Sequence, residues 1–309
     1  MSHWNTADIP DQTGRTVLVT GATSGLGLQT ATALARRGAT VLMTCRDSRR
    51  GQEAWEQLLY DSDGMGATLV LLDLADLTSV RQAAEHIREL TGDRLDVLVN
   101  NAGVMATPAR LTVNGFELQI ATNHLGHAAL TWLLAPALVP GARVVTVSSL
   151  AHRCGGLDVD DLNFDRRRYN PVTAYSASKL ANLLFTFELD RRARAAGRDL
   201  LAVAAHPGLA STELAASSAR MYSTGPFSNV VRWGTKMITQ GAARGALPQL
   251  YAATAPVVRS GEYYGPTSLG QTRGAPGRVA ASAAARDERT ARLLWERTAE
   301  LTGVTPDPA

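Results

Sequence analysis

The chain has 309 residues, of which 45% are hydrophobic and 19% charged, a composition that indicates a globular protein and excludes a disordered one. Its formal charge of +3 is small, and acidic residues beside the basic runs at 166–168 and 191–194 argue against a nucleic-acid partner. Two cysteines supply neither a disulfide framework nor a metal-ligand spacing, so we expect no metal and a reduced, cytoplasmic setting.

Nothing in the sequence suggests a membrane partner. The N-terminus is polar and lacks the basic and apolar regions of a signal peptide. The most apolar stretch, residues 128–139, is too short to span a bilayer and contains Pro136. We therefore expect no association with a membrane.

Short β-branched runs alternate with longer amphipathic segments from residue 16 to about 206. The expected strands are 16–20, 40–45, 68–72, 97–100, 143–148, 200–205 and a last one near 262–264. The expected helices are 25–37, 49–60, 77–90, 114–134, 174–196 and, at the C-terminus, about 286–302. This alternation predicts an α/β fold, a Rossmann-type doubly wound parallel sheet of about seven strands with helices on both faces, in a single domain over 1–309.

Three segments lack this periodicity. Residues 158–171 are polar and predict a loop outside the functional site. Residues 211–245 are rich in small and turn residues, and about 209–240 would form a substrate-binding loop or lid. Residues 270–277 also predict a loop.

A glycine-rich turn follows the first expected strand, in Thr20-Gly21-Ala-Thr-Ser-Gly25-Leu-Gly27. Gly21 permits a tight turn, Gly25 lets the backbone approach a pyrophosphate, and Gly27 allows close packing of the next helix. The N-terminus of that helix would face phosphates with unpaired N–H groups and its positive dipole end. The turn therefore predicts a dinucleotide-binding site.

A tyrosine and a lysine lie four residues apart in Tyr175-Ser-Ala-Ser-Lys179, within a chain whose basic residues are otherwise arginine except for Lys236. Positions i and i+4 share one face of a helix. The ammonium can then lie beside the phenol and lower its pKa, which would make the phenol a general acid/base near neutral pH.

Together these features resemble the short-chain dehydrogenase/reductase family, and the resemblance covers about residues 14 to 213. The glycine spacing and the Tyr175–Lys179 pair match the family pattern, and further family elements follow in the expected order. These are Asn100-Asn101-Ala102-Gly103, Asn123, Ser148-Ser149 and Pro207-Gly208. The strings Ser149-Leu-Ala-His152 and Ser178-Lys-Leu-Ala-Asn182 resemble the retinol-dehydrogenase-like branch.

The resemblance implies a catalytic role for four residues. Tyr175 would exchange a proton with the substrate oxygen, which Ser149 would also hold. Lys179 would lower the pKa of Tyr175 and bind the nicotinamide ribose, and Asn123 would anchor a water chain to solvent. Alternatives are that Ser148 acts in place of Ser149, that Ser149 only forms a turn, that Asn123 only caps or bridges helices, or that Lys179 is a solvated helix residue.

The resemblance also implies a nicotinamide cofactor, and Arg46 favours NADP(H) over NAD(H). Arg46 is the first residue after the second strand and suits a 2′-phosphate, although Asp47 leaves the NAD(H) interpretation open and Arg46 could be a surface residue. Asp73 would accept from the adenine amino group, since Asp76 is better placed to cap the next helix. The expected cofactor-binding residues are Gly21, Thr23, Ser24, Gly25, Leu26, Gly27, Arg46, Asp73, Leu74, Asn100, Ala102, Gly103, Tyr175, Lys179, Pro207, Gly208, Leu209 and Thr212.

The expected substrate is a small hydrophobic alcohol, aldehyde or ketone, bound by Ser149 and Tyr175. Six residues are candidates for the wall of the substrate pocket, although they could equally be core residues of a lid helix. They are Met221, Tyr222, Phe227, Val230, Val231 and Trp233. An apolar stripe on the helix after Tyr175 (Leu180, Leu183, Leu184 and Phe187) could form a homodimer or homotetramer interface, and core packing explains it equally well.

The sequence therefore predicts an NAD(P)(H)-dependent oxidoreductase. One alternative is a catalytically inactive nucleotide-binding sensor of the same fold. Another is an epimerase or dehydratase that acts on a sugar nucleotide.

Overall fold

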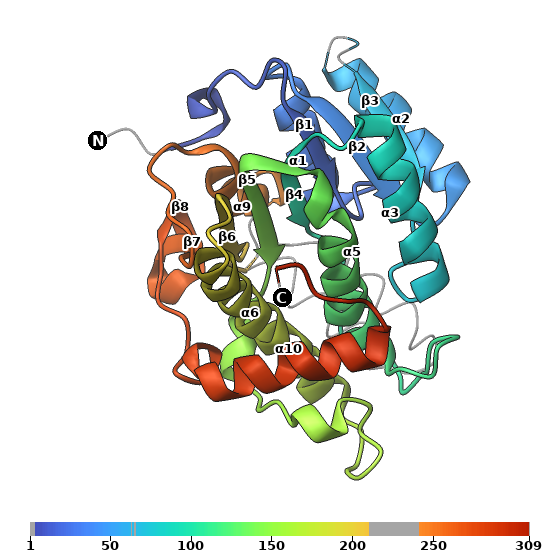
Figure 1. The fold of residues 1–309 in the computed structure, drawn as a ribbon. Coiled ribbons are helices and arrows are strands. Elements are labelled where there is room, and N and C mark those ends of the chain that lie inside the picture. Colours follow the sequence, from blue (N-terminus) through green and yellow to red (C-terminus); the bar gives the residue numbers. More distant parts are fainter. Residues whose placement is uncertain (1–3, 63, 65, 210–240, 309) are drawn as a thin grey trace, which may run out of the picture.

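The computed structural model describes residues 4–62, 64, 66–209 and 241–308. Thr212, the expected wall residues between 221 and 233, and all of the expected lid except Leu209 lie outside the described residues. The described part forms an α/β fold around one sheet (Figure 1).

The sheet has eight strands in the order β3-β2-β1-β4-β5-β6-β7-β8, and every neighbouring pair is parallel except β7 with β8. The strands are β1 (Thr16–Val19), β2 (Thr40–Cys45), β3 (Ala67–Leu71), β4 (Leu95–Asn100), β5 (Leu138–Val147), β6 (Leu200–Ala205), β7 (Tyr263–Ser268) and β8 (Arg273–Arg278). The strand order reverses between β1 and β4, which places a ligand crevice at the carboxyl ends of these two strands. The doubly wound architecture predicted from the sequence is thus confirmed.

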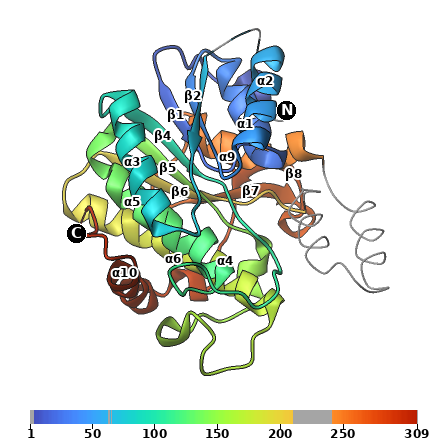
Figure 2. The same cartoon turned by 90° about the vertical axis from the view of Figure 1, so that its right-hand side faces the viewer.

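Helices cover both faces of the sheet (Figure 2). Side chains of α3 (Leu77–Thr91), α5 (Gly126–Leu134) and α6 (Pro171–Ala195) form a core on one face. Side chains of α1 (Gly25–Ala35), α2 (Ser48–Asp61) and α9 (Ala242–Thr254) form a core on the other. Because both faces are covered, the central strands are buried runs such as Val17, Leu18 and Val19, each 0% exposed.

The C-terminal helix α10 (Glu288–Thr302) packs across α6 (Figure 1). Its Trp295 stacks on Phe185 with ring centroids 5.3 Å apart, and Trp132 meets the same indole edge-on at 4.8 Å. The apolar stripe of α6 is buried inside the chain, since Leu180 and Phe187 are each 2% exposed. Core packing therefore explains the stripe, and its interpretation as a subunit interface is wrong.

The structure corrects three expected elements. Residues 273–278 form edge strand β8, where a loop was expected, so the sheet has eight strands and not seven. The helix expected from Asn114 begins only at Leu118, as the short helix α4 (Leu118–Ile120). Helix α6 begins at Pro171, three residues before the expected start, because Asn170 caps it by accepting from the backbone N–H groups of the next turn.

Acidic neighbours neutralise both basic runs. Arg167 pairs with Asp161 at 2.9 Å. Arg191 and Arg192 share the buried Glu188 at 2.6 and 2.8 Å. Among the described residues, no helix is both long enough and apolar enough to cross a membrane.

Candidate active site

The glycine-rich turn leaves β1 at the crevice and leads into α1. Gly21 has φ +63°, and a Cβ there would lie 2.8 Å from the Cβ of Ala102. A Cβ on Gly27 would lie 2.4 Å from the carbonyl oxygen of Gly21. By contrast, Gly25 (φ +53°) has nothing within 4 Å of the Cβ position. Two glycines thus permit close packing, and the third opens onto free space where a pyrophosphate would fit.

The N-terminus of α1 is not capped by a side chain. Ser24 is the N-cap residue but makes no side-chain hydrogen bond to the first turn, and that turn contains no acidic residue. Its N–H groups and the positive end of the helix dipole therefore remain available to an anion in front of Gly25. Thr23 and Leu26, also expected to contact the cofactor, are partly exposed in the same turn.

A buried hydrogen-bond chain joins this turn to the loop after β4. The Thr20 hydroxyl accepts from the backbone N–H groups of Asn101 and Ala102, both at 2.9 Å. His127 Nε2 lies 2.9 Å from that hydroxyl, and His127 Nδ1 lies 3.0 Å from the carbonyl oxygen of Asn123. A carbonyl only accepts, so Nδ1 carries the proton and Nε2 accepts from Thr20.

Burial lowers the pKa of His127 to about 4, which keeps its ring neutral as this chain of bonds requires. The sequence analysis did not single out His127. The available signal was its position one helical turn after Asn123, facing the same way.

Three acidic residues near the expected adenosine end accept hydrogen bonds from backbone N–H groups of the chain. Asp47 caps α2 by accepting from the backbone N–H of Arg50 at 3.0 Å, a bond that lowers its pKa. Asp76 caps α3 by accepting from Thr78, as expected. Asp73 accepts from Ala75 at 2.9 Å and is partly exposed, beside the buried Leu74. Arg46 is exposed directly after β2.

The loop after β4 brings Gly103 to the site, whereas the side chain of Asn100, the last residue of β4, points into the core. Gly103 lies close to two polar side chains, since a Cβ there would be 3.1 Å from Asn123 Oδ1 and 3.5 Å from Lys179 Nζ on α6. Asn100, in contrast, is fully buried and donates its side-chain amide to Thr131 at 3.0 Å. The Asn100 side chain therefore serves the core.

Tyr175 is half-buried on α6, and its side chain interacts with that of Ser149. Burial raises the pKa of Tyr175, and the interaction with Ser149 partly offsets this rise. Lys179 Nζ lies 5.9 Å from the centroid of the tyrosine ring. The net shift of the Tyr175 pKa in the chain alone is therefore upward, and Lys179 is not among the groups that cause it.

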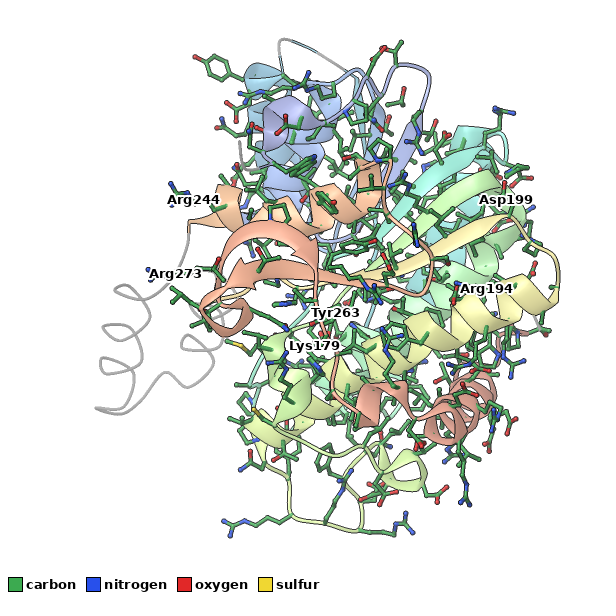
Figure 3. The ribbon with its side chains drawn as sticks, turned by 90° about the vertical axis from the view of Figure 1, so that its left-hand side faces the viewer. Lys179, Arg194, Asp199, Arg244, Tyr263 and Arg273 are labelled. Atoms are coloured by element: carbon green, nitrogen blue, oxygen red, sulfur yellow. The ribbon has the colours of Figure 1, made fainter. Side chains whose placement is uncertain are left out.

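Lys179 is 3% exposed, so its interpretation as a solvated helix residue is wrong. Its Nζ donates to the carbonyl oxygen of Val147 at 3.0 Å, and burial lowers its pKa to about 8. Figure 3 shows Lys179 on α6 toward the end of the sheet where Arg273 lies, with Arg194 and Asp199 at the opposite end. The ammonium is thus held at the carboxyl edge of the sheet, near Gly103.

The two serines after β5 have different roles. Ser148 is 2% exposed and donates its hydroxyl to the Lys179 carbonyl at 2.8 Å, which ties β5 to α6. Ser149 is partly exposed, contacts Tyr175 and accepts from the backbone N–H of Ala151 at 3.2 Å. Ser149 therefore forms a turn and also presents its hydroxyl beside the phenol. This geometry favours Ser149 over Ser148.

Asn123 lies in a π-helical turn (Ala121–Leu125), a rare structure that often marks functional sites. Its side chain accepts from the backbone N–H of Val104 at 2.8 Å and donates to the Val104 carbonyl and to Ser178, both at 2.9 Å. Asn123 thus bridges the loop after β4 to α6, as one of the alternatives supposed. The same bridge fixes Gly103 beside Lys179.

The segment after β6 completes the edge of the site. Gly208 has φ +69°, and a Cβ there would lie 2.4 Å from the carbonyl oxygen of Thr272. Leu209 donates its backbone N–H to the same oxygen at 3.0 Å. Pro207 is partly exposed. This segment therefore rests on the turn between β7 and β8.

Comparison with known proteins agrees with this geometry. The model of the short chain dehydrogenase family matches residues 15–223. Human retinol dehydrogenase 13 is 40% identical over 299 residues, which cover 94% of this chain and 85% of that protein. The crystal structure of an uncharacterized protein from Mycobacterium paratuberculosis superposes with a TM-score of 0.81 at 44% identity, over 98% of each chain.

A short chain dehydrogenase from Burkholderia cenocepacia J2315, solved in complex with NADP, is more distant. Its TM-score is 0.61 at 25% identity, over 82% of this chain and 96% of that one. The family match and the close relatives agree with each other and with the fold. The chain therefore belongs to the short-chain dehydrogenase/reductase family of nicotinamide-dependent oxidoreductases, in its retinol-dehydrogenase-like branch.

Proposed function

We propose that the protein transfers a hydride between NADP(H) and a hydrophobic alcohol, aldehyde or ketone, with Tyr175 as the general acid/base. The observation that carries this proposal is the meeting of Tyr175, Ser149 and Lys179 at the carboxyl edge of the sheet, next to an open glycine turn. No observation favours an inactive sensor. An assay of NADPH absorbance with a panel of hydrophobic aldehydes and ketones tests the proposal, with NADH in parallel.

The substrate oxygen would accept hydrogen bonds from Tyr175 and Ser149. These bonds would hold the reacting carbon in place, and the bound nicotinamide supplies or takes up the hydride. Because burial raises the pKa of Tyr175, its phenol stays protonated at neutral pH and can donate its proton during carbonyl reduction. In alcohol oxidation the phenol must first lose that proton, and the charge of Lys179 favours the phenolate.

Arg46 would bind the 2′-phosphate of NADP(H). Its guanidinium is exposed directly after β2, whereas the carboxylate of Asp47 is engaged in capping α2 and is less free to bind a ribose hydroxyl. The NADP complex of the Burkholderia relative supports this preference.

Replacing Arg46 by alanine tests the cofactor preference. We expect the dissociation constant of NADPH to rise about 10- to 100-fold, which is the effect of one lost charge-assisted contact, with little change for NADH. Protein fluorescence titrations with both cofactors measure this. The exposed Arg289→Ala on α10 is the control and should change neither value. Equal losses for NADPH and NADH would show that Arg46 does not recognise the phosphate.

The hydrophobic substrate is supported by the name of a close relative, since retinol is a long apolar alcohol. A polar substrate turned over far faster than every apolar carbonyl in the panel would contradict this part of the proposal. A cytoplasmic location stays a prediction from the cysteine content, and cell fractionation tests it.

A further inference from the structure

The turn between β7 and β8 has an unusual backbone. Leu269, Gly270 and Gln271 have φ values of +48°, +65° and +70°, so three consecutive residues are left-handed and two of them carry side chains. Residues other than glycine rarely adopt this conformation, and such strain persists where surrounding contacts impose it. Leu269 is 74% exposed, whereas Gln271 is partly buried.

Gln271 lies against His206, the residue just before Pro207. His206 is 1% exposed, and its ring is fixed by Tyr263, with centroids 5.0 Å apart, and by the backbone of Gly265. Burial is the largest influence on the pKa of His206 and lowers it to about 3, whereas the contact with Gln271 raises it slightly against this trend. The ring is therefore neutral at physiological pH.

The hydrogen bonds of His206 identify its tautomer. Nδ1 accepts from the backbone N–H of Gly208 at 3.1 Å, so Nε2 carries the single ring proton. Neither His206 Nε2 nor Gln271 Oε1 makes a hydrogen bond of normal geometry, and both are buried. His206 Nε2 is a donor and Gln271 Oε1 is an acceptor, and the two side chains are in contact. A small movement of either side chain would let these two atoms form a hydrogen bond. Such a bond is favourable, because a buried polar group without a partner lowers the stability of the fold.

This pair lies beside Pro207-Gly208-Leu209, the segment that the family resemblance implies would contact the nicotinamide amide. His206 holds Gly208 from one side, and the carbonyl of Thr272, next to Gln271, receives the N–H of Leu209 at 3.0 Å. The turn therefore acts on Pro207-Gly208-Leu209 in two ways, indirectly through Gln271 and His206 and directly through the backbone of Thr272. Hydrogen bonds at active sites often reach normal length only once the ligand is bound.

We propose that Gln271 is a positioning residue whose hydrogen bond to His206 closes when the nicotinamide half of the cofactor binds. The strained turn holds the amide of Gln271 in place for that bond. Closure fixes Pro207-Gly208-Leu209 against the nicotinamide amide. This inference rests on the proposed function, because it requires that the segment bind the nicotinamide.

The test compares Gln271→Gly with Leu269→Gly in the full chain. Glycine accepts a positive φ without strain, so both substitutions should leave the thermal midpoint unchanged or raise it by about 2 °C. Only Gln271→Gly removes the contact with His206. We expect its dissociation constant for NADPH to rise roughly fivefold, the effect of one lost hydrogen bond, and that of Leu269→Gly to match the wild type.

Adenosine 2′,5′-bisphosphate carries the adenine and 2′-phosphate half of NADPH without the nicotinamide. Its dissociation constant should be the same for both variants and the wild type. Unchanged NADPH affinity in Gln271→Gly would overturn the inference and leave the proposed function intact. Equal weakening of both ligands, or a lower thermal midpoint, would show a merely structural role and also overturn it. Failure of the wild type to bind NADPH would instead overturn the proposed function.

Discussion

Replacing Tyr175 by phenylalanine should lower the turnover number about 1000-fold or more, because a positioned general acid/base contributes about 10²- to 10⁴-fold. The substitution removes one hydroxyl and keeps the ring. Ser149 retains its bond with Ala151, so the neighbouring turn should persist. NADPH affinity and the thermal midpoint should therefore stay near the wild-type values. Steady-state kinetics, fluorescence titration and thermal unfolding measure the three quantities.

Tyr60→Phe is the matched control, because Tyr60 is 83% exposed on α2 and the chemical change is identical. It should leave turnover unchanged. If Tyr175→Phe kept more than about a tenth of the activity, the assignment of Tyr175 as the acid/base would fail.

Replacing Lys179 by methionine should strongly lower the turnover number and stabilise the fold at neutral pH. The ammonium is buried, and burial lowers its pKa from 10.5 to about 8, which corresponds to a cost of about 3 kcal/mol for keeping the charge inside. Methionine removes this cost and one hydrogen bond to Val147, whose carbonyl keeps a bond from Asn182 at 3.1 Å. We expect the free energy of unfolding at pH 7 to rise by about 2 kcal/mol, with turnover falling about 100-fold or more.

The pH dependence checks the cause of this stabilisation. Below pH 8 the folded and unfolded chains both carry the charge, so the folded wild type bears the full cost. Between pH 8 and 10.5 the folded chain loses its proton first, so the wild type gains stability relative to Lys179→Met. Denaturant unfolding at several pH values should show the difference shrinking across this window. A variant less stable than the wild type at pH 7 would contradict the account.

Much of the fold follows from the sequence, because buried parallel strands and amphipathic helices leave distinct periodic patterns. Strand β8 does not, since residues 273–278 contain two glycines and Pro276. An edge strand tolerates proline because the backbone groups along its outer edge form no hydrogen bonds to another strand. Strand β8 is therefore recognised only from its pairing in the folded sheet. Helix α9 was also missed. It contains Gly245 and Pro248, and its small residues are suited to close packing against α1 rather than to a strong helical pattern.

Some features of the candidate site can likewise be predicted from the sequence, and others cannot. The spacing of Tyr175 and Lys179 and the order of the glycine, asparagine and serine motifs are enough to predict the main residues of the site. The upward shift of the Tyr175 pKa could not be predicted, because burial depends on contacts that are remote in the sequence. The helix expected from Asn114 starts late, since the segment before it is held by side-chain bonds from Asn163 to Glu117 and Gly115. The roles of His127 and His206 depend on the tautomer of each ring, which only their hydrogen-bond partners define.

A crystal structure of the protein with NADP⁺ tests the central claim most directly. We expect Tyr175 Oη within about 5 Å of nicotinamide C4 and Lys179 Nζ bonded to the nicotinamide ribose, since the substrate oxygen must reach the phenol while its carbon meets C4. A nicotinamide ring bound far from Tyr175, or a dinucleotide bound away from the turn at Gly21–Gly27, would contradict the account.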